Sequence, residues 1–169
     1  MLVVLIGLGV LIGIMGWIYW PEIIGAGWSP TPMENVRKML KMAGVGKDDV
    51  VYDLGCGDGR IIIAAAGEFG ARAVGIEADP LRFLLSFVRI KVSGLGSKVK
   101  VIWGNFFHHN LSDATVVTVF LSNEANDKLR AKLKKELSPG TRVISYYWIF
   151  SGWKAVKADF SSHLYMYQI

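Results

Sequence analysis

The sequence contains only one cysteine, Cys56, among 169 residues, so no internal disulfide can form. Its three histidines, His108, His109 and His163, have no metal-ligand spacing with that cysteine. We therefore predict no metal site. The sequence also lacks internal repeats and low-complexity tracts, and its length suits one domain.

Charged side chains are absent from residues 1–20, MLVVLIGLGVLIGIMGWIYW. A helix of twenty residues spans about 30 Å, the thickness of the hydrocarbon core of a bilayer. Trp17, Tyr19 and Trp20 stand at one end of this run, and amphipathic aromatic side chains favour the membrane interface. We therefore predict a transmembrane anchor over residues 1–21 and a linker over residues 22–29. The alternative is a cleaved signal peptide, which would need basic residues before a shorter apolar run.

Basic residues follow this segment: Arg37, Lys38, Lys41 and Lys47. Their placement agrees with a single-pass membrane protein whose following domain is cytoplasmic. The formal net charge of +5 favours an acidic partner or an anionic membrane surface. Gly9 and Gly13 form a G-x-x-x-G pattern that would pack two such helices together, so the oligomeric state stays open.

Short apolar segments alternate with amphipathic helical segments from residue 30 to the C-terminus. Helices are predicted over residues 33–43, after the glycine-rich turn, and over residues 81–94 and 124–137. Strands are predicted from Val50 and over residues 72–77, 98–103, 114–121, 141–149, 153–158 and 163–168, the last two as an antiparallel hairpin. This order predicts an α/β domain over residues 30–169 with a doubly wound, seven-stranded, mostly parallel sheet.

The turn after the first predicted strand is rich in glycine and reads Asp53-Leu54-Gly55-Cys56-Gly57-Asp58-Gly59-Arg60. Glycine lets the backbone bend sharply and lie flat against a ligand, and amides at the start of the next helix can hold an anionic group. A dinucleotide fingerprint would need glycine or alanine in place of Arg60. A second acidic residue, Glu77, ends the next predicted strand, 24 residues after Asp53.

This glycine spacing, with acidic residues at two successive strand ends, resembles the cofactor motif of class I S-adenosylmethionine (SAM) methyltransferases. The resemblance implies that Asp53 faces the methionine end of SAM and that Glu77 accepts hydrogen bonds from both ribose hydroxyls. It further implies that the loop at Asn105 and Phe106 meets the adenine. Cys56 is then a small residue beside the cofactor, in preference to a catalytic thiol.

Two other segments narrow the resemblance, namely Pro-Thr-Pro at residues 30–32 and Gly-Asn-Phe-Phe at residues 104–107. With the glycine turn, they are similar to the archaeal broad-specificity protein-lysine methyltransferases and to the mitochondrial lysine methyltransferases that modify the ATP synthase c subunit and the adenine nucleotide translocase. The likeness covers about residues 29–153 and implies methylation of protein lysine side chains. The predicted cofactor-binding residues are Thr31, Asp53, Gly55, Cys56, Gly57, Glu77, Asn105 and Phe106.

The segment after the fourth predicted strand lacks the Asn/Asp/Ser-Pro-Pro-aromatic motif typical of methyltransferases that act on bases or glutamine amides. We therefore expect no nucleic-acid partner. An aliphatic amine would be held in an aromatic slot by cation–π contacts. The candidates for lining this slot are Trp28, Leu121, Ser122, Asn123, Tyr146 and Trp148, and alternation along the fifth strand places the last two on one side. No residue is assigned as catalytic base.

Two alternatives stay open beside a protein-lysine methyltransferase on membrane-proximal substrates. The first is a small-molecule or lipid methyltransferase that uses the anchor to reach an apolar substrate. The second is a non-catalytic SAM-binding module tethered to a membrane complex. Lysine is favoured over arginine and N-terminal acceptors by the family likeness alone.

Overall fold

The computed structural model describes residues 7–9, 13 and 29–169. Most of the predicted anchor at residues 1–21 and of the predicted linker at residues 22–29 lies outside the described residues, as does Trp28. Within the part of the chain that is described, no helix is both long enough and apolar enough to cross a bilayer.

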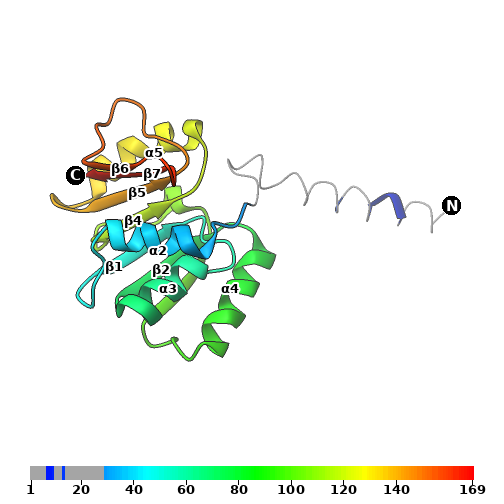
Figure 1. Ribbon diagram of the computed structural model, residues 1–169. Helices are drawn as coiled ribbons and strands as arrows, with labels where there is room; N and C mark the ends of the chain where they lie inside the picture. The colour runs from blue at the N-terminus through cyan, green and yellow to red at the C-terminus, as the bar shows by residue number, and fades with distance from the viewer. Residues whose placement is uncertain (1–6, 10–12, 14–28) are drawn as a thin grey trace.

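Residues 50–168 contribute seven strands to one sheet, in the order β3-β2-β1-β4-β5-β7-β6 (Figure 1). The first five are parallel and are β1 (Val50–Leu54), β2 (Arg72–Glu77), β3 (Val99–Trp103), β4 (Val116–Val119) and β5 (Arg142–Tyr146). The hairpin of β6 (Lys157–Asp159) and β7 (Leu164–Gln168) adds to β5 in antiparallel orientation. The predicted seven-stranded, mostly parallel sheet is confirmed.

Helices cover both faces of the sheet. On one face α2 (Met33–Met42), α3 (Arg60–Phe69) and α4 (Pro80–Val92) share a hydrophobic cluster with the strands. On the other face α5 (Asn123–Glu136) buries Leu129 and Leu133. Because β1 and β4 are covered on both sides, every residue in them is buried, as expected for central parallel strands.

Strand β5 is shorter than predicted. It ends at Tyr146, and Tyr147 has a positive φ of 70°, so the backbone leaves the extended conformation there. The prediction that Tyr146 and Trp148 share one side of a continuous strand was therefore wrong, since alternation holds only within the strand. Strand β4 is also shorter, because Ser122 caps α5 by accepting a hydrogen bond from the Ala125 amide at 3.1 Å.

Candidate active site

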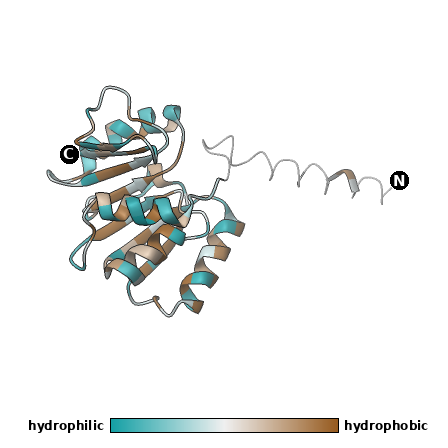
Figure 2. Cartoon of the chain, in the orientation of Figure 1, coloured by the Kyte–Doolittle hydropathy of each residue, from teal (hydrophilic) through white to brown (hydrophobic). Residues whose placement is uncertain are grey.

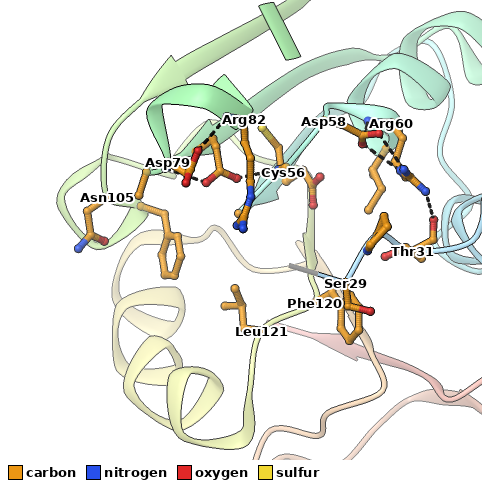
Figure 3. A pocket seen from close by; sticks show the side chains of 18 residues that line it. Ser29, Thr31, Cys56, Asp58, Arg60, Asp79, Arg82, Asn105, Phe120 and Leu121 are labelled. Carbon is orange, nitrogen blue, oxygen red and sulfur yellow. Dashed lines mark hydrogen bonds and ion pairs between the residues drawn. The ribbon is translucent and has the colours of Figure 1, made fainter. Parts of the chain in front are cut away.

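The carboxyl ends of β1, β2 and β4 surround a pocket at the point where the strand order reverses, which is the usual ligand position in such sheets (Figure 3). The pocket combines polar groups, such as Asp53 and Glu77, with apolar walls at Phe106 and Leu121, a lining typical of a small-molecule site. All the residues predicted to bind the cofactor line it: Thr31, Asp53, Gly55, Cys56, Gly57, Glu77, Asn105 and Phe106.

The glycine turn forms one wall of the pocket. Gly55, Gly57 and Gly59 all have positive φ angles, between 56° and 81°, which other residues rarely adopt. The amides of Gly55 and Cys56 both donate to the carbonyl oxygen of Ile76, at 2.9 and 3.1 Å, and fasten the turn to β2. The backbone is therefore held flat against the pocket.

Cys56 is buried beneath this turn. A Cβ added at Gly75 of β2 would lie 2.6 Å from the Cys56 sulfur, so β2 requires glycine where it passes the thiol. Burial, together with the charges of Asp53 and Glu77, raises the pKa of Cys56 well above its ordinary value. A thiol in this state is a poor nucleophile, which argues against a catalytic role for it.

Asp53 is a buried carboxylate at the end of β1, with only 3% of its surface exposed. Its Oδ1 accepts a hydrogen bond from the Thr118 hydroxyl at 2.8 Å, and no ion pair to it is formed within residues 29–169. Burial, with the nearby carboxylates of Glu77 and Asp58, raises the pKa of Asp53 to about 7. A buried acid without a counter-ion at a pocket wall fits a cationic ligand group, such as an ammonium.

Glu77 ends β2 and is held by backbone donors on both sides. Its Oε2 accepts from the Gly57 amide at 2.7 Å, and its Oε1 accepts from the Asp79 amide at 2.9 Å. A carboxylate has about four acceptor positions, so both oxygens keep capacity for further donors from the pocket. Glu77 thus joins the glycine turn to the start of α4 and still fits a ligand that carries hydroxyl groups.

Asn105 and Phe106 follow β3 and line the pocket, and Asn105 lies across it from Thr31 (Figure 3). The Asn105 side-chain oxygen accepts from the Phe107 amide at 3.0 Å and caps the short helix η1 (Phe106–His108). The amide nitrogen of Asn105 is the group left to meet a ligand. Phe106 is buried against Phe107, with ring centroids 4.7 Å apart, and it offers an apolar wall beside that nitrogen.

Sequence reasoning missed the ion-pair network that fixes the opposite wall. Arg60 donates to both oxygens of Asp58, at 2.9 and 2.7 Å, and its Nη1 donates to the carbonyl oxygen of Thr31 at 2.9 Å. Arg89 of α4 also pairs with Asp58. Burial by itself would raise the pKa of Asp58, but the hydrogen bonds from Arg60 and the charges of both arginines hold it below its ordinary value. The Asp58-x-Arg60 spacing was the available signal for this contact.

The predicted acceptor-side residues are only partly brought together. Leu121 lines the pocket with Phe120, which sequence reasoning missed. Tyr146 packs edge-on against Phe120, with centroids 4.6 Å apart, and its hydroxyl accepts from the Asn35 side chain at 3.0 Å. Tyr146, Ser122, Asn123 and Trp148 are not among the pocket-lining residues within the described part of the chain.

A seven-stranded α/β sheet, with a glycine turn and acidic residues at the ends of β1 and β2, defines the class I SAM-dependent methyltransferases. The family model described as the ANTKMT methyltransferase domain matches residues 53–157. The chain belongs to this methyltransferase family.

Individual relatives agree with this assignment. A protein of Saccharolobus islandicus named protein-lysine N-methyltransferase is 44% identical over 147 residues, which cover 83% of this chain and 91% of that protein. The adenine nucleotide translocase lysine N-methyltransferase of Mus musculus is 33% identical, and the match spans 77% of this chain but only 55% of that protein. A Salinibacter ruber structure, described as an RNA methyltransferase in complex with S-adenosyl-L-homocysteine, has 41% identity and a TM-score of 0.81, over 83% of this chain and 94% of that one.

Proposed function

We propose that this chain is a SAM-dependent methyltransferase whose acceptor is the ε-amine of protein lysine. The observation that carries the proposal is the 44% identity to the S. islandicus protein-lysine N-methyltransferase across nearly the whole of that protein. The pocket supports the SAM-dependent part of the proposal, because the glycine turn and the acidic residues at the ends of β1 and β2 line it together.

The pocket residues divide the work of holding SAM. Asp53 would pair with the ammonium of the methionine end, beside Thr31, whose carbonyl oxygen accepts from Arg60. Glu77 would accept from the ribose hydroxyls, and Asn105 and Phe106 would meet the adenine. Bound SAM supplies a methyl group on a sulfonium that is already electrophilic, so the protein contributes chiefly by positioning the two reactants.

The acceptor side is apolar and aromatic. Phe120 and Leu121 line the pocket, and Tyr146 stands behind Phe120. A lysine amine must be neutral to attack, and removal of water by such a wall lowers the pKa of an ammonium. Aromatic faces also attract the cationic form during approach. In this proposal the apolar wall favours the neutral lysine amine, and no side chain is assigned as catalytic base.

The S. ruber structure supports a second candidate, methyl transfer to RNA, since it is described as an RNA methyltransferase and is 41% identical to this chain. A lipid or small-molecule acceptor is a further alternative, favoured by the uncharged first twenty residues. The three acceptor classes separate physically after the reaction, because protein, RNA and lipid partition into different extracts.

The test is to incubate the full chain and methyl-labelled SAM with extracts that contain membrane proteins, RNA and lipids. We expect label in the protein fraction, with mass spectrometry placing it on lysine side chains, and no label with the Asp53→Asn variant. Label confined to RNA or to the organic extract would reject the lysine assignment. SAM binding without transfer to any fraction would indicate a non-catalytic module.

Residues 1–21 form the membrane anchor in this proposal, residues 22–29 the linker, and residues 30–169 a methyltransferase domain on the cytoplasmic side. The support is the absence of charge from residues 1–20 and the aromatic residues at their end. When cell membranes are washed with alkaline carbonate, the full chain should stay in the pellet. Release into the supernatant would contradict an anchor.

A further inference from the structure

Helix α4 is oriented with most of its apolar side chains toward solvent. Its fully buried residues are Ser86 and Ile90 only. A stripe of exposed apolar residues lies on the opposite side of the helix and consists of Leu81, Leu84, Leu85, Val88 and Val92. At 3.6 residues per turn, these five fall within about 100° of one another around the helix axis. We call this set the α4 stripe.

Aromatic side chains extend the α4 stripe toward the edge strand β3. Trp103 is 62% exposed, and its ring nitrogen donates to the Ala78 carbonyl at 3.1 Å. Phe83 lies between Trp103 and the exposed Phe87, with ring centroids 6.4 and 6.3 Å from theirs. Figure 2 shows α4 at the outer side of the domain, with hydrophobic and hydrophilic residues interleaved along it. The three rings therefore form one aromatic cluster beside the α4 stripe.

The segment that carries the α4 stripe has charges of one sign. No acidic residue occurs between Asp79 and Asp113, whereas five basic residues do: Arg82, Arg89, Lys91, Lys98 and Lys100. Lys91 borders one side of the stripe. On the other side Arg89 is paired with Asp58 and Arg82 lines the pocket, so the cations of this segment outside the pocket and its ion pairs are Lys91, Lys98 and Lys100. Lys91 lies over the Phe87 ring, 5.5 Å from its centroid, so its stem follows the apolar surface and leaves the ammonium at the border.

We infer that the α4 stripe is a docking face for an anionic lipid bilayer. A helix with an apolar face, a lysine at its border and nearby exposed aromatics has the composition of interfacial helices, which bind through apolar area and attraction to anionic headgroups. Packing of two copies stripe to stripe would instead bring Lys91 against residues 80–112 of the other copy, which contain no acidic side chain to pair with it. The α4 stripe therefore suits an anionic lipid surface better than it suits the same stripe of a second copy of the chain.

Docking on α4 has a consequence for the active site. Arg82 in the first turn of α4 and Ser29, where the described domain begins, both line the pocket. Ser29 and the first turn of α4 therefore lie at the same pocket. A bilayer beneath α4 brings the pocket mouth near the membrane surface, where lysines of membrane-embedded proteins emerge.

The test uses the full chain with an environment-sensitive fluorophore on Val88→Cys. The native Cys56 is 4% exposed and has a raised pKa, so it stays unlabelled. The matched control is Lys128→Cys, an exposed position on α5 at the other face of the sheet. Both proteins are reconstituted into vesicles of phosphatidylcholine and into vesicles that also contain phosphatidylglycerol. Cosedimentation is not the readout, because residues 1–20 could hold the chain on either vesicle.

At residue 88 we expect a blue shift and quenching by nitroxide-labelled lipid in the anionic vesicles, both reduced by salt. The probe at residue 128 should remain in water. Equal exposure at the two positions in anionic vesicles would overturn the inference. So would shielding of residue 88 that is the same in neutral vesicles and in detergent, since that points to a second copy or another segment of the chain. Methylation of a soluble protein acceptor by the labelled Val88→Cys chain verifies folding and reports separately on the proposed function.

Discussion

Replacing Asp53 with asparagine is expected to abolish SAM binding and, at the same time, to make the unliganded protein more stable. The carboxylate is buried and has no counter-ion within residues 29–169, so its ionised form is costly in the empty pocket. Asparagine removes this charge and retains an oxygen that accepts from the Thr118 hydroxyl. It also removes the group that we propose pairs with the SAM ammonium.

The sign of the stability change follows from the pKa of about 7 in the folded protein against an ordinary value of 3.8. Between these values the folded state holds a proton that the unfolded state has lost, so the free energy of unfolding declines as pH rises from about 4 to about 7. Asp53→Asn removes this decline. Thermal unfolding should therefore show a stability gain that grows across this window and reaches up to about 4 kcal/mol above pH 7.

The same pKa predicts how SAM affinity changes with pH. Only the ionised carboxylate pairs with an ammonium, so affinity should fall about tenfold for each pH unit below 7, with proton release on binding. Calorimetry in buffers of different ionisation enthalpy measures that proton. The exposed Asp48→Asn serves as control and should change neither stability nor affinity. A variant at Asp53 that binds SAM normally, or that is less stable at high pH, would contradict this role.

Glu77→Gln is expected to weaken SAM binding by about 30- to 150-fold and to lower the unfolding temperature. Both Glu77 oxygens accept from backbone amides, those of Gly57 and Asp79. Glutamine can supply only one of these acceptors and turns an N–H group toward the other amide. The amide left without an acceptor lowers the free energy of unfolding by about 1–3 kcal/mol. The affinity loss has a separate cause: the ribose would lose a charged acceptor, and a hydrogen bond to a charged group contributes about 2–3 kcal/mol, which corresponds to this fold-change.

The control for this substitution is Glu124→Gln, which changes an exposed carboxylate paired with Lys128 on α5. It should leave SAM affinity unchanged, because exposed pairs of this type contribute little. Titration calorimetry and thermal unfolding measure the two effects. If Glu77→Gln loses stability but keeps SAM affinity, Glu77 only supports the glycine turn, and its proposed contact with the ribose is wrong.

The pocket wall formed by the glycine turn and the acidic strand ends could be predicted because it depends on residues close together in the sequence. Asp53 and Glu77 end successive strands, and parallel strands place their carboxyl ends at one edge of the sheet. The conformation of the turn between β1 and α3 follows from its glycines, because Gly55, Gly57 and Gly59 all adopt left-handed backbone angles. Short-range patterns thus sufficed for this half of the site.

The acceptor side could not be predicted in the same way, because it depends on contacts between distant segments. The Tyr146 hydroxyl accepts a hydrogen bond from Asn35, which lies 111 residues earlier in the chain. No periodic pattern in the sequence predicts a contact between residues so far apart. The left-handed backbone at Tyr147 ends β5 at Tyr146, although the apolar sequence that predicted the strand continues beyond it. The stripe on α4 resembled an ordinary amphipathic helix, because periodicity shows that a face exists and not which face meets the sheet.

Titration calorimetry of the full chain with SAM at pH 8 tests the central claim, that carboxylates at the ends of β1 and β2 hold the cofactor. We expect saturable binding at one site in the unaltered chain and none in the double variant Asp53→Asn, Glu77→Gln. An unaltered chain that does not bind SAM, or a double variant that binds it with unchanged affinity, would contradict the claim.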